Sequence, residues 1–556
     1  MSEINGGRIF AKALKKEGVE CVFTLAGGHI MPILYGCRAE GIQVVDVRHE
    51  CSGGYGADAY ARVSGKPGVL ITTAGPGVTN ATTAMAEAMD AGIPLIHIGG
   101  ASPQKENITG PLQELKSLEA MSVFCKWSER IISSDRIPEY VAHAFRNALD
   151  NTPGPVYLEI AFEVLYEVYE EDDLYWPEAY RTDSQPFGDP ALIEKAAELL
   201  IDSKRPVMIV GDNARFSKDY EEYVEQLSNY LSIPVYAMNV ARGVFGNEIK
   251  NPLWTLGGFA VPAADVILEI CVNNNYLIYK GQPPYFPEDA IKIQIHPDKT
   301  KIGFNTRADV GIVAGAGAAA KQILENVKEK TEPIDRSQWL ETATQLTIET
   351  AASYTQATQS DIQPPHPGRA ASEVVSFVEK EAPDMHIVAD GGDSAQWMVN
   401  NAKATYPGQV INYGPLGTIG VGMGFSMGAY MADKKPVLCY TGDGSFGFYP
   451  MEFDTFLRHD IPVICVISND SSWGMIKLSE EICNAEEVNK NGHLACTLEH
   501  MRAYEKFVDI WGGVGIQVTR YEDIIPALRK VYESGKPGIV NIQVDETKMS
   551  PATAEF

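Results

Sequence analysis

The sequence predicts an α/β protein made of three doubly wound domains, each built on a parallel β-sheet. Short apolar runs of strand length alternate with helical stretches along most of the chain. Two acidic or Pro-rich segments interrupt the alternation, at residues 166–190 and 330–368. A length of 556 residues suits three or four domains of ordinary size. We therefore expect domains at residues 1–165, 191–330 and 369–550.

The composition favours a cytoplasmic protein that binds neither nucleic acid nor membranes. Its net charge of −27 repels polyanions and anionic lipid surfaces. An anionic ligand would therefore need a metal ion or backbone dipoles to offset the overall field. No apolar run has the length of a membrane span, and the N-terminal stretch lacks the apolar centre of a signal peptide. The nine cysteines contain no CxxC pair and indicate reduced thiols.

The expected strands of the first domain end in glycine or polar residues. They cover residues 22–25, 44–47, 69–72 and 94–98, and the first three run into Gly27-Gly28-His29, Arg48-His49-Glu50 and Gly75-Pro76-Gly77. In the central domain we expect strands at residues 207–210, 235–237, 266–268 and 291–295. Parallel strands present their carboxyl ends at one edge of a sheet, so these turns are candidate binding loops.

The third domain contains the most informative stretch. An apolar run at residues 437–440 leads into Gly442-Asp443-Gly444, a helical segment follows, and a second apolar run at residues 463–467 ends at Ser468-Asn469-Asp470. This strand–turn–helix–strand order predicts a parallel crossover that brings Asp443 and Asp470 side by side. Mg²⁺ binds one or two carboxylates together with phosphate oxygens and water, and glycines let backbone N–H groups approach a diphosphate. The alternative is that Gly-Asp-Gly is an ordinary turn.

This stretch resembles the cofactor motif of the thiamine-diphosphate-dependent enzymes, in which GDG and a spacer precede Asn-Asn or Asn-Asp. The resemblance implies that Asp443, the Asp470 side chain and the Ser472 carbonyl bind Mg²⁺. It also implies that the first and third domains bind the pyrimidine and the diphosphate of the cofactor. The implied cofactor contacts nearby are Gly442, Gly444, Ser445, Trp473 and Gly474.

The first domain resembles the pyrimidine-binding half of the same family in the segments RHECSGGYGADAYAR and AGPGVTNATTAMAEAMDAGIPLIHIGG. The resemblance implies that Glu50 exchanges a proton with the aminopyrimidine ring, and that Gly75 contacts the cofactor. The cofactor would then react through a C2 carbanion and enamine. Without the resemblance, Glu50 reads as a helix cap.

Three further cofactor contacts follow from the resemblance. Ile419 would support the bent form of the cofactor, and Gly417 belongs to the same segment. Ser394 would donate a hydrogen bond to the diphosphate. A glycine-rich helix start and a plain helix cap are the alternative interpretations.

His29 and Gln113 are the candidate catalytic residues on the substrate side. His29 follows a Gly-Gly turn and could relay protons, and the segment GGHIMP resembles the corresponding turn of benzaldehyde lyase. Gln113 resembles a family glutamine that hydrogen-bonds a bound carbonyl. A structural histidine and a surface glutamine are the alternatives.

The reaction we expect is that of a lyase or carboligase that cleaves or forms 2-hydroxy ketones (acyloins) from aldehydes, 2-hydroxy ketones or 2-oxo acids. The segment EFDT resembles both benzaldehyde lyase and the 2-hydroxyacyl-CoA lyases, and the Ser-Trp-Gly form of SWGM is most similar to benzaldehyde lyase. Acetolactate synthase-like and 2-hydroxyacyl-CoA lyase-like activities are the alternatives, whereas the absence of histidine from residues 101–130 counts against simple decarboxylases. Residues 476–497 form either a lid or a surface excursion. The resemblance implies a homodimer or homotetramer with active sites between subunits.

Overall fold

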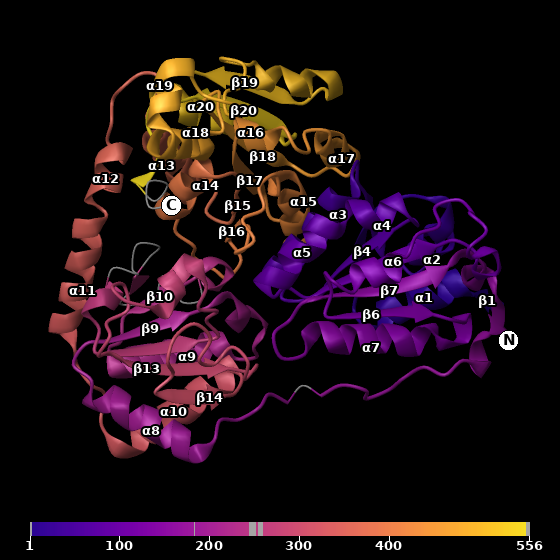
Figure 1. Cartoon of the computed structure of the whole chain (residues 1–556), viewed down its shortest axis with the longest axis horizontal. Coiled ribbons are helices and arrows are strands. Elements are labelled where there is room, and N and C mark those ends of the chain that lie inside the picture. The colour runs from indigo at the N-terminus through magenta and orange to yellow at the C-terminus, as the bar shows by residue number, and fades with distance from the viewer. Residues whose placement is uncertain (1–2, 183, 244–251, 254–259, 552–556) are drawn as a thin grey trace.

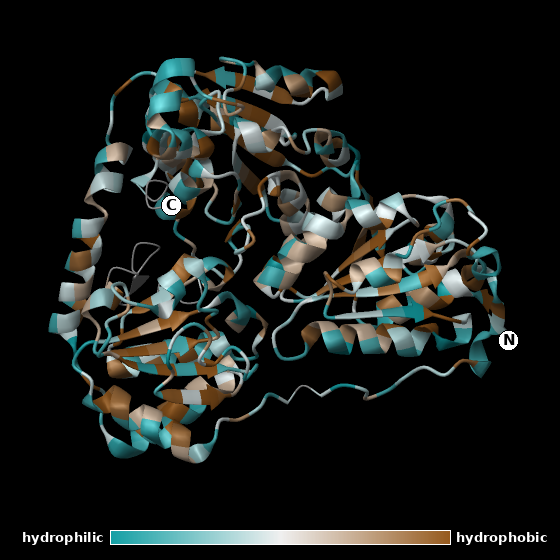
Figure 2. Cartoon of the chain, viewed as in Figure 1, coloured by the Kyte–Doolittle hydropathy of each residue, from teal (hydrophilic) through white to brown (hydrophobic). Residues whose placement is uncertain are grey.

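The computed structural model describes residues 3–182, 184–243, 252–253 and 260–551. Three separate parallel sheets lie within these ranges, in the purple, magenta and orange-to-yellow parts of Figure 1. Helices and loops cover both faces of each sheet, and Figure 2 shows the apolar strands inside and hydrophilic residues on the outer helices. This arrangement confirms the predicted fold class. Among the described residues, no helix combines the length and the apolar character needed to span a bilayer.

The first sheet has the strand order β3-β2-β4-β5-β7-β6, and its neighbouring strands are parallel. The chain moves outward from β2 to β3 and then returns to β4, so the strand order reverses between β2 and β4. Ligands bind at such reversals in open α/β sheets. The elements are β2 (Cys21–Leu25), β3 (Gln43–Asp46), β4 (Gly68–Thr72), β5 (Leu95–Ala101), β6 (Trp127–Ile131), β7 (Pro155–Ala161), α1 (Gly6–Lys16), α2 (Met31–Ala39), α3 (Glu50–Ser64), α4 (Pro76–Asn80), α5 (Thr82–Ala91), α6 (Ser117–Met121) and α7 (Ile137–Leu149).

The central sheet has the order β11-β10-β9-β12-β13-β14 and is also parallel. Its elements are β9 (Pro206–Val210), β10 (Val235–Ala237), β11 (Pro252–Leu253), β12 (Val266–Ile270), β13 (Ile291–His296), β14 (Val310–Val313), α8 (Pro190–Asp202), α9 (Tyr220–Leu231) and α10 (Ala316–Lys330). The three helices bury one face of the sheet. The predicted domain at residues 191–330 includes residues 244–251 and 254–259, which lie outside the described part of the chain.

The third sheet has the order β16-β15-β17-β18-β20-β19, and the strand order reverses between β15 and β17. Its strands are β15 (His386–Ala389), β16 (Val410–Asn412), β17 (Val437–Gly442), β18 (Val463–Asn469), β19 (Val514–Val518) and β20 (Gly538–Gln543). Its helices are α13 (Pro367–Glu381), α14 (Asp393–Asn401), α15 (Gly422–Asp433), α16 (Asp443–Phe446), α17 (Glu452–Arg458), α18 (Gly474–Cys483), α19 (Ala485–Asn491) and α20 (Ile524–Ser534).

Helices α3 and α15 join the first domain to the third through glycine contacts. A Cβ on Gly424 would lie 2.6 Å from the backbone oxygen of Ser52, and one on Gly428 would lie 2.1 Å from that of Gly56. Both distances are shorter than carbon–oxygen contact allows, so only glycine permits this close approach. The apolar residues of both helices belong to one continuous core.

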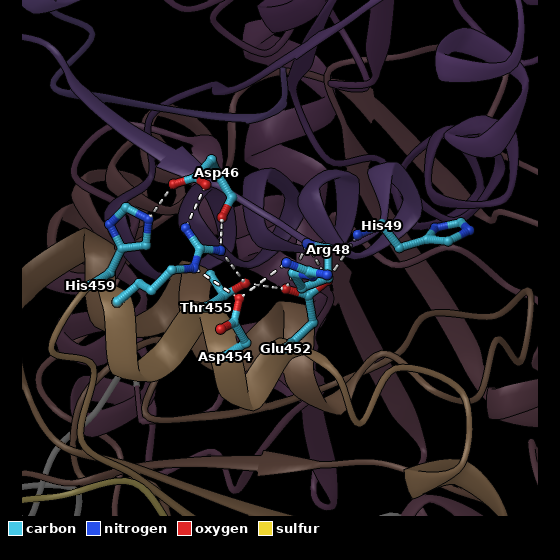
Figure 3. A network of polar contacts seen from close by, with 8 residues as sticks. Asp46, Arg48, His49, Glu452, Asp454, Thr455 and His459 are labelled. Atoms are coloured by element: carbon cyan, nitrogen blue, oxygen red, sulfur yellow. Dashed lines mark hydrogen bonds and ion pairs between the residues drawn. The ribbon is translucent and has the colours of Figure 1, made fainter. Parts of the chain in front are cut away.

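A polar network beside these helices also connects the first and third domains (Figure 3). The backbone N–H groups of Arg48 and His49 donate to the Glu452 carboxylate at 3.0 and 3.1 Å. Arg458 and His459 bind the Asp46 carboxylate, at 2.5 and 2.8 Å. Glu452 is fully buried, and burial raises its pKa. The EFDT segment thus anchors the backbone immediately before Glu50.

Several segments are more ordered than the sequence indicated. Part of the first predicted linker forms β8 (Val168–Glu170), which pairs antiparallel with β1 (Glu3–Asn5) and so extends the first domain. The second predicted linker, residues 330–368, contains the helices α11 (Ser337–Thr350) and α12 (Ala352–Thr358). Residues 476–497 are mostly helical, in α18 and α19. These short or polar elements carry weak hydrophobic periodicity, which explains why sequence patterns missed them.

Candidate active site

The ends of β17 and β18 bring two carboxylates together. The strands are parallel neighbours, with Gly442 opposite Ser468 at their carboxyl ends. Asp443 follows β17 as the first residue of α16, and Asp470 follows β18. Asp443 is 2% exposed, and neither of its carboxylate oxygens has a hydrogen-bond partner. Burial, together with the charge of Asp470, raises the pKa of Asp443 to about 8.

This pair has the chemistry of a divalent-cation site. Two adjacent carboxylates in a buried position repel each other, and a cation between them would remove the repulsion and supply the missing partner of Asp443. The backbone N–H of Ser472 donates to the Asp470 carboxylate at 3.1 Å, which holds the turn around that side chain. A Cβ on Gly474 would lie 2.5 Å from Asp470 Oδ2, so a glycine is required beside the carboxylate. The residues present therefore fit Mg²⁺.

A cavity of about 250 Å³ opens beside the two carboxylates, and all its lining residues lie between positions 367 and 544. The site residues predicted in the third domain all line it: Ser394, Gly417, Ile419, Gly442, Asp443, Gly444, Ser445, Asp470, Ser472, Trp473 and Gly474. Glycines occur where side chains would obstruct the cavity wall. A Cβ on Gly444 would meet the Trp473 ring at 2.7 Å, and Gly417 has a positive φ of 74°. Such a cradle suits a diphosphate.

Asp390 organises this cavity, and sequence reasoning missed it. It directly follows β15, is 1% exposed, and accepts hydrogen bonds from the N–H groups of Gly391, Gly420 and Gly422 at 2.7, 2.9 and 3.1 Å. The Thr441 hydroxyl donates to the same carboxylate at 3.1 Å. Asp390 thereby connects its own turn after β15 to the loop at residues 420–422 and to the end of β17. The sequence does contain a sign of this role, because Asp390 follows an apolar strand and directly precedes Gly391-Gly392.

Glu50 lies at the start of α3 in the first domain and is 5% exposed. The Asn80 side chain donates to its Oε2 at 2.9 Å. A Cβ on Gly77 would lie 3.6 Å from Glu50 Oε1, so the Gly75-Pro76-Gly77 turn passes close to the carboxylate. Glu50 is therefore at the helix start, as the cap interpretation requires, but the residue that caps this helix is His49, whose side chain accepts from the N–H of Cys51.

His29 and Gln113 meet at Thr73, which follows β4. The Thr73 hydroxyl donates to Gln113 Oε1 at 3.3 Å and lies 3.2 Å from His29 Nδ1. The Thr73 hydroxyl therefore links the His29 ring to the Gln113 side chain. His29 is 8% exposed, and burial lowers its pKa, so the neutral ring is favoured.

Gly75 belongs to the same cluster, because a Cβ there would meet Gln113 at 2.9 Å. Glu50, Gly75, His29 and Gln113 therefore gather at the carboxyl edge of the first sheet, near its strand-order reversal. They form a group separate from the cavity lining, which contains no residue of the first domain. Within one chain, the two predicted halves of the site stand apart.

Residues 474–497 contribute to the cavity wall. Met475 and Ile476, at the start of α18, line the cavity together with Trp473. The backbone N–H of Trp473 donates to Cys496 O at 2.8 Å, and Ser472 forms an antiparallel bridge with Thr497. The segment expected as a lid or excursion is thus tied at both ends to the loop that carries Asp470.

Three family models match the chain in sequence order. Residues 4–121 match the N-terminal TPP binding domain of thiamine pyrophosphate enzymes, residues 193–323 match the central domain, and residues 390–542 match the C-terminal TPP binding domain. The matched ranges correspond to the three sheets described above.

Curated relatives align over nearly the full chain. A probable acetolactate synthase of Mycobacterium bovis is 28% identical, covering 99% of this chain and 97% of the relative. The 2-hydroxyacyl-CoA lyase 1 of Mus musculus is 27% identical, with 98% and 94% covered. The oxalyl-CoA decarboxylase of Escherichia coli is 28% identical, with 97% and 95% covered.

Proposed function

The chain belongs to the thiamine pyrophosphate enzyme family, and from this premise we propose that it is a Mg²⁺-dependent lyase or carboligase that cleaves or forms 2-hydroxy ketones. The chain is a thiamine-diphosphate-dependent enzyme of the acetolactate synthase, 2-hydroxyacyl-CoA lyase and oxalyl-CoA decarboxylase type. The proposal of an acyloin lyase or carboligase goes further, because it specifies which substrate bond breaks and which side chains transfer the substrate's protons.

The third domain supplies the residues that would hold the cofactor. Asp443, Asp470 and the Ser472 carbonyl would bind Mg²⁺, and the glycine-lined cavity beside them would hold the diphosphate. When bound, thiamine diphosphate supplies a nucleophilic carbon and an electron sink for carbon–carbon bond chemistry. Glu50 would exchange a proton with the aminopyrimidine ring nitrogen, and its contact with Asn80 keeps the carboxylate oriented.

The observation that carries the lyase assignment is the His29–Thr73–Gln113 cluster. With its proton on Nδ1, the neutral imidazole would carry its lone pair on Nε2, which would suit removal of a proton from a substrate hydroxyl. The Gln113 amide can donate to the neighbouring carbonyl oxygen. Cleavage of a 2-hydroxy ketone requires a base for the hydroxyl, whereas decarboxylation alone does not. An acyloin is therefore the substrate that uses both side chains.

The separation of the two groups within one chain supports an assembly in which Glu50 of one subunit faces the cavity of another. We expect a homodimer as the minimum unit, or a homotetramer composed of such dimers. The substrates would be aldehydes, 2-hydroxy ketones or 2-oxo acids, and we expect a cytoplasmic location.

The test is a comparison of substrates under one condition. The protein, with thiamine diphosphate and Mg²⁺, is incubated separately with benzoin, pyruvate and a 2-hydroxyacyl-CoA, and products are identified by mass spectrometry. Aldehyde release from benzoin, lost in His29→Ala but retained in the matched control His500→Ala, supports the assignment. His500 is exposed. Carbon dioxide from pyruvate without a ligated product, and no reaction with benzoin, would reject it.

A lyase acting on 2-hydroxyacyl-CoA is the second candidate, and a cavity of about 490 Å³ favours it. This cavity lies at the carboxyl edge of the central sheet, where doubly wound folds bind nucleotides. Arg146 is among its lining residues and could bind a phosphate group, whereas Arg181, which also lines it, is paired with Glu17. The same position would also accept FAD. Formyl-CoA formation in the substrate comparison, reduced in Arg146→Gln, distinguishes this candidate from the first.

A further inference from the structure

Three metal-binding side chains meet in the segment that follows the cofactor loop. Glu480 lies in α18, and His493 and Cys496 lie after α19. One ligand atom of each lies within 4.8 Å of those of the other two. In the described ranges, from residue 3 to residue 551 with their gaps, no other group of three His, Cys, Asp or Glu side chains meets this distance. The cluster plays no part in the proposed reaction.

The distances resemble those between ligands of a bound zinc ion. His493 Nδ1 and Cys496 Sγ lie 3.2 and 3.3 Å from the same Glu480 oxygen, Oε2. Tetrahedral zinc with its usual bonds to nitrogen, oxygen and sulfur has ligand–ligand separations of about 3.3–3.8 Å. The ligand atoms could therefore surround zinc after an adjustment of a few tenths of an ångström.

The neighbouring groups orient the ligands. Glu481 Oε1 lies 3.3 Å from His493 Nε2, and metal-binding histidines commonly donate their second ring N–H to a carboxylate in this way. The backbone N–H of Leu494 donates to both Glu480 oxygens, at 3.3 and 3.1 Å. Cys496 is fully buried, whereas the His493 and Glu480 side chains are 19% and 17% exposed, which leaves access for an ion and one water molecule.

We propose that Glu480, His493 and Cys496 bind a zinc ion, or a comparable transition-metal ion, with water as the fourth ligand. One thiolate and one carboxylate neutralise its two positive charges, and the Cys496 thiol releases its proton to solvent on binding. The ion would connect α18 to residues 493–496, and α19 lies in the chain between these two attachment points.

The position of the cluster gives the ion a structural role at the active site. Cys496 accepts a hydrogen bond from Trp473, and Leu498 donates to Ser471 O at 2.8 Å. Trp473 and Ser472 line the cofactor cavity. A metal ion bound to Cys496 would therefore stiffen the cavity wall formed by residues 471–476. This role concerns the order of the wall and holds whichever carbonyl substrate the enzyme uses.

The test uses the untagged full-length protein, stripped with a chelator and titrated with Zn²⁺ or Co²⁺. We expect one ion per chain, and a thiolate-to-cobalt charge-transfer band in the absorption spectrum. Cys496→Ser should abolish that band and weaken zinc binding at least about a hundredfold, and Glu481→Gln should weaken binding about 10–100-fold. The matched control is Cys483→Ser, which removes an exposed thiol from α18 and should change neither quantity.

Hydrogen exchange provides a readout independent of turnover. Zinc should slow exchange in residues 474–497 of the wild-type protein and leave Cys496→Ser unchanged. Equal zinc stoichiometry and affinity in wild type and Cys496→Ser would overturn the proposal, as would a cobalt complex without the thiolate band. Circular dichroism establishes whether Cys496→Ser is folded. If it is not, unchanged zinc affinity in folded Glu481→Gln and His493→Gln would overturn the proposal instead.

Discussion

Asp443 occupies a position that is unfavourable for a carboxylate without a cation. Burial and the neighbouring charge of Asp470 raise its pKa to about 8, and its two carboxylate oxygens are among the buried polar atoms without a hydrogen-bond partner. Proteins retain such unsatisfied groups chiefly where a ligand or ion completes them. The residue types and spacing predicted this pair from sequence, because the strand–turn–helix–strand pattern determines where both aspartates lie.

In Asp443→Asn, the free energy of unfolding should depend much less on Mg²⁺ than it does in the wild-type protein. The wild-type protein with thiamine diphosphate should gain about 2.7 kcal/mol when the ion is present at 100 times its dissociation constant. The variant should gain much less, because one charged ligand is lost. Urea unfolding with and without Mg²⁺ measures both values. An equal gain in the two proteins would contradict the assignment of Asp443 as a metal ligand.

Glu269, a buried carboxylate on β12 at the centre of the middle sheet, predicts a pH dependence of stability. Burial raises its pKa to about 7, against about 4.3 in an unfolded chain. Between these values the folded state holds the proton more tightly, so the stability falls as pH rises from about 4 to about 7. The glutamine side chain of Glu269→Gln is uncharged at every pH in this range, so the variant should not show this fall in stability. Thermal unfolding of both proteins across that range tests it, and parallel curves would count against the prediction.

At the scale of elements, the strands that bear the site were predictable and several short elements were not. Apolar runs predicted β17 and β18 to within two residues, because buried parallel strands are continuously hydrophobic. Neither β6, which is partly exposed, nor the helices at residues 474–491 carry such a pattern. The role of Asp390 was also hidden, since its contacts with residues 420–422 and with Thr441 form only in the folded chain.

The crossing of α3 and α15 predicts a stability effect. Gly428→Ala would place a Cβ 2.1 Å from Gly56 O, so the helices would have to separate. Overpacking of this kind costs about 1–3 kcal/mol, which denaturant unfolding would detect. Gly28→Ala is the control, because a Cβ there meets nothing within 4 Å. A Gly428→Ala protein as stable as the control would show that the helices do not pack this closely.

At the scale of the whole molecule, sequence order does not reveal which domains share a site. The resemblance implied that Glu50 and Asp443 act together, whereas one chain keeps Glu50 outside the cavity that contains Asp443. The packing of α3 against α15 joins the domains but does not bring these residues into one cavity. The shared site stays a prediction that concerns the assembly.

Mixing two inactive variants tests the shared site. Glu50→Gln and Asp443→Asn should each lose at least about a hundredfold in turnover. If each site combines two subunits, co-expression should restore up to about a quarter of wild-type activity, because half of randomly formed dimers contain one intact site of two. Each variant co-expressed with itself is the control. If activity is not restored although mass spectrometry detects mixed dimers, both residues must come from one chain.

The carboxylate of Asp390 has a consequence for attempts to redesign this enzyme. Because it accepts hydrogen bonds from Gly391, Gly420, Gly422 and Thr441, it ties the turn after β15, the loop at residues 420–422 and the end of β17 to one anchor. A library that varies the loop at residues 420–422 would therefore also shift the other two segments. Changes that aim at substrate preference are therefore better placed outside these three segments, so that the anchor at Asp390 stays intact.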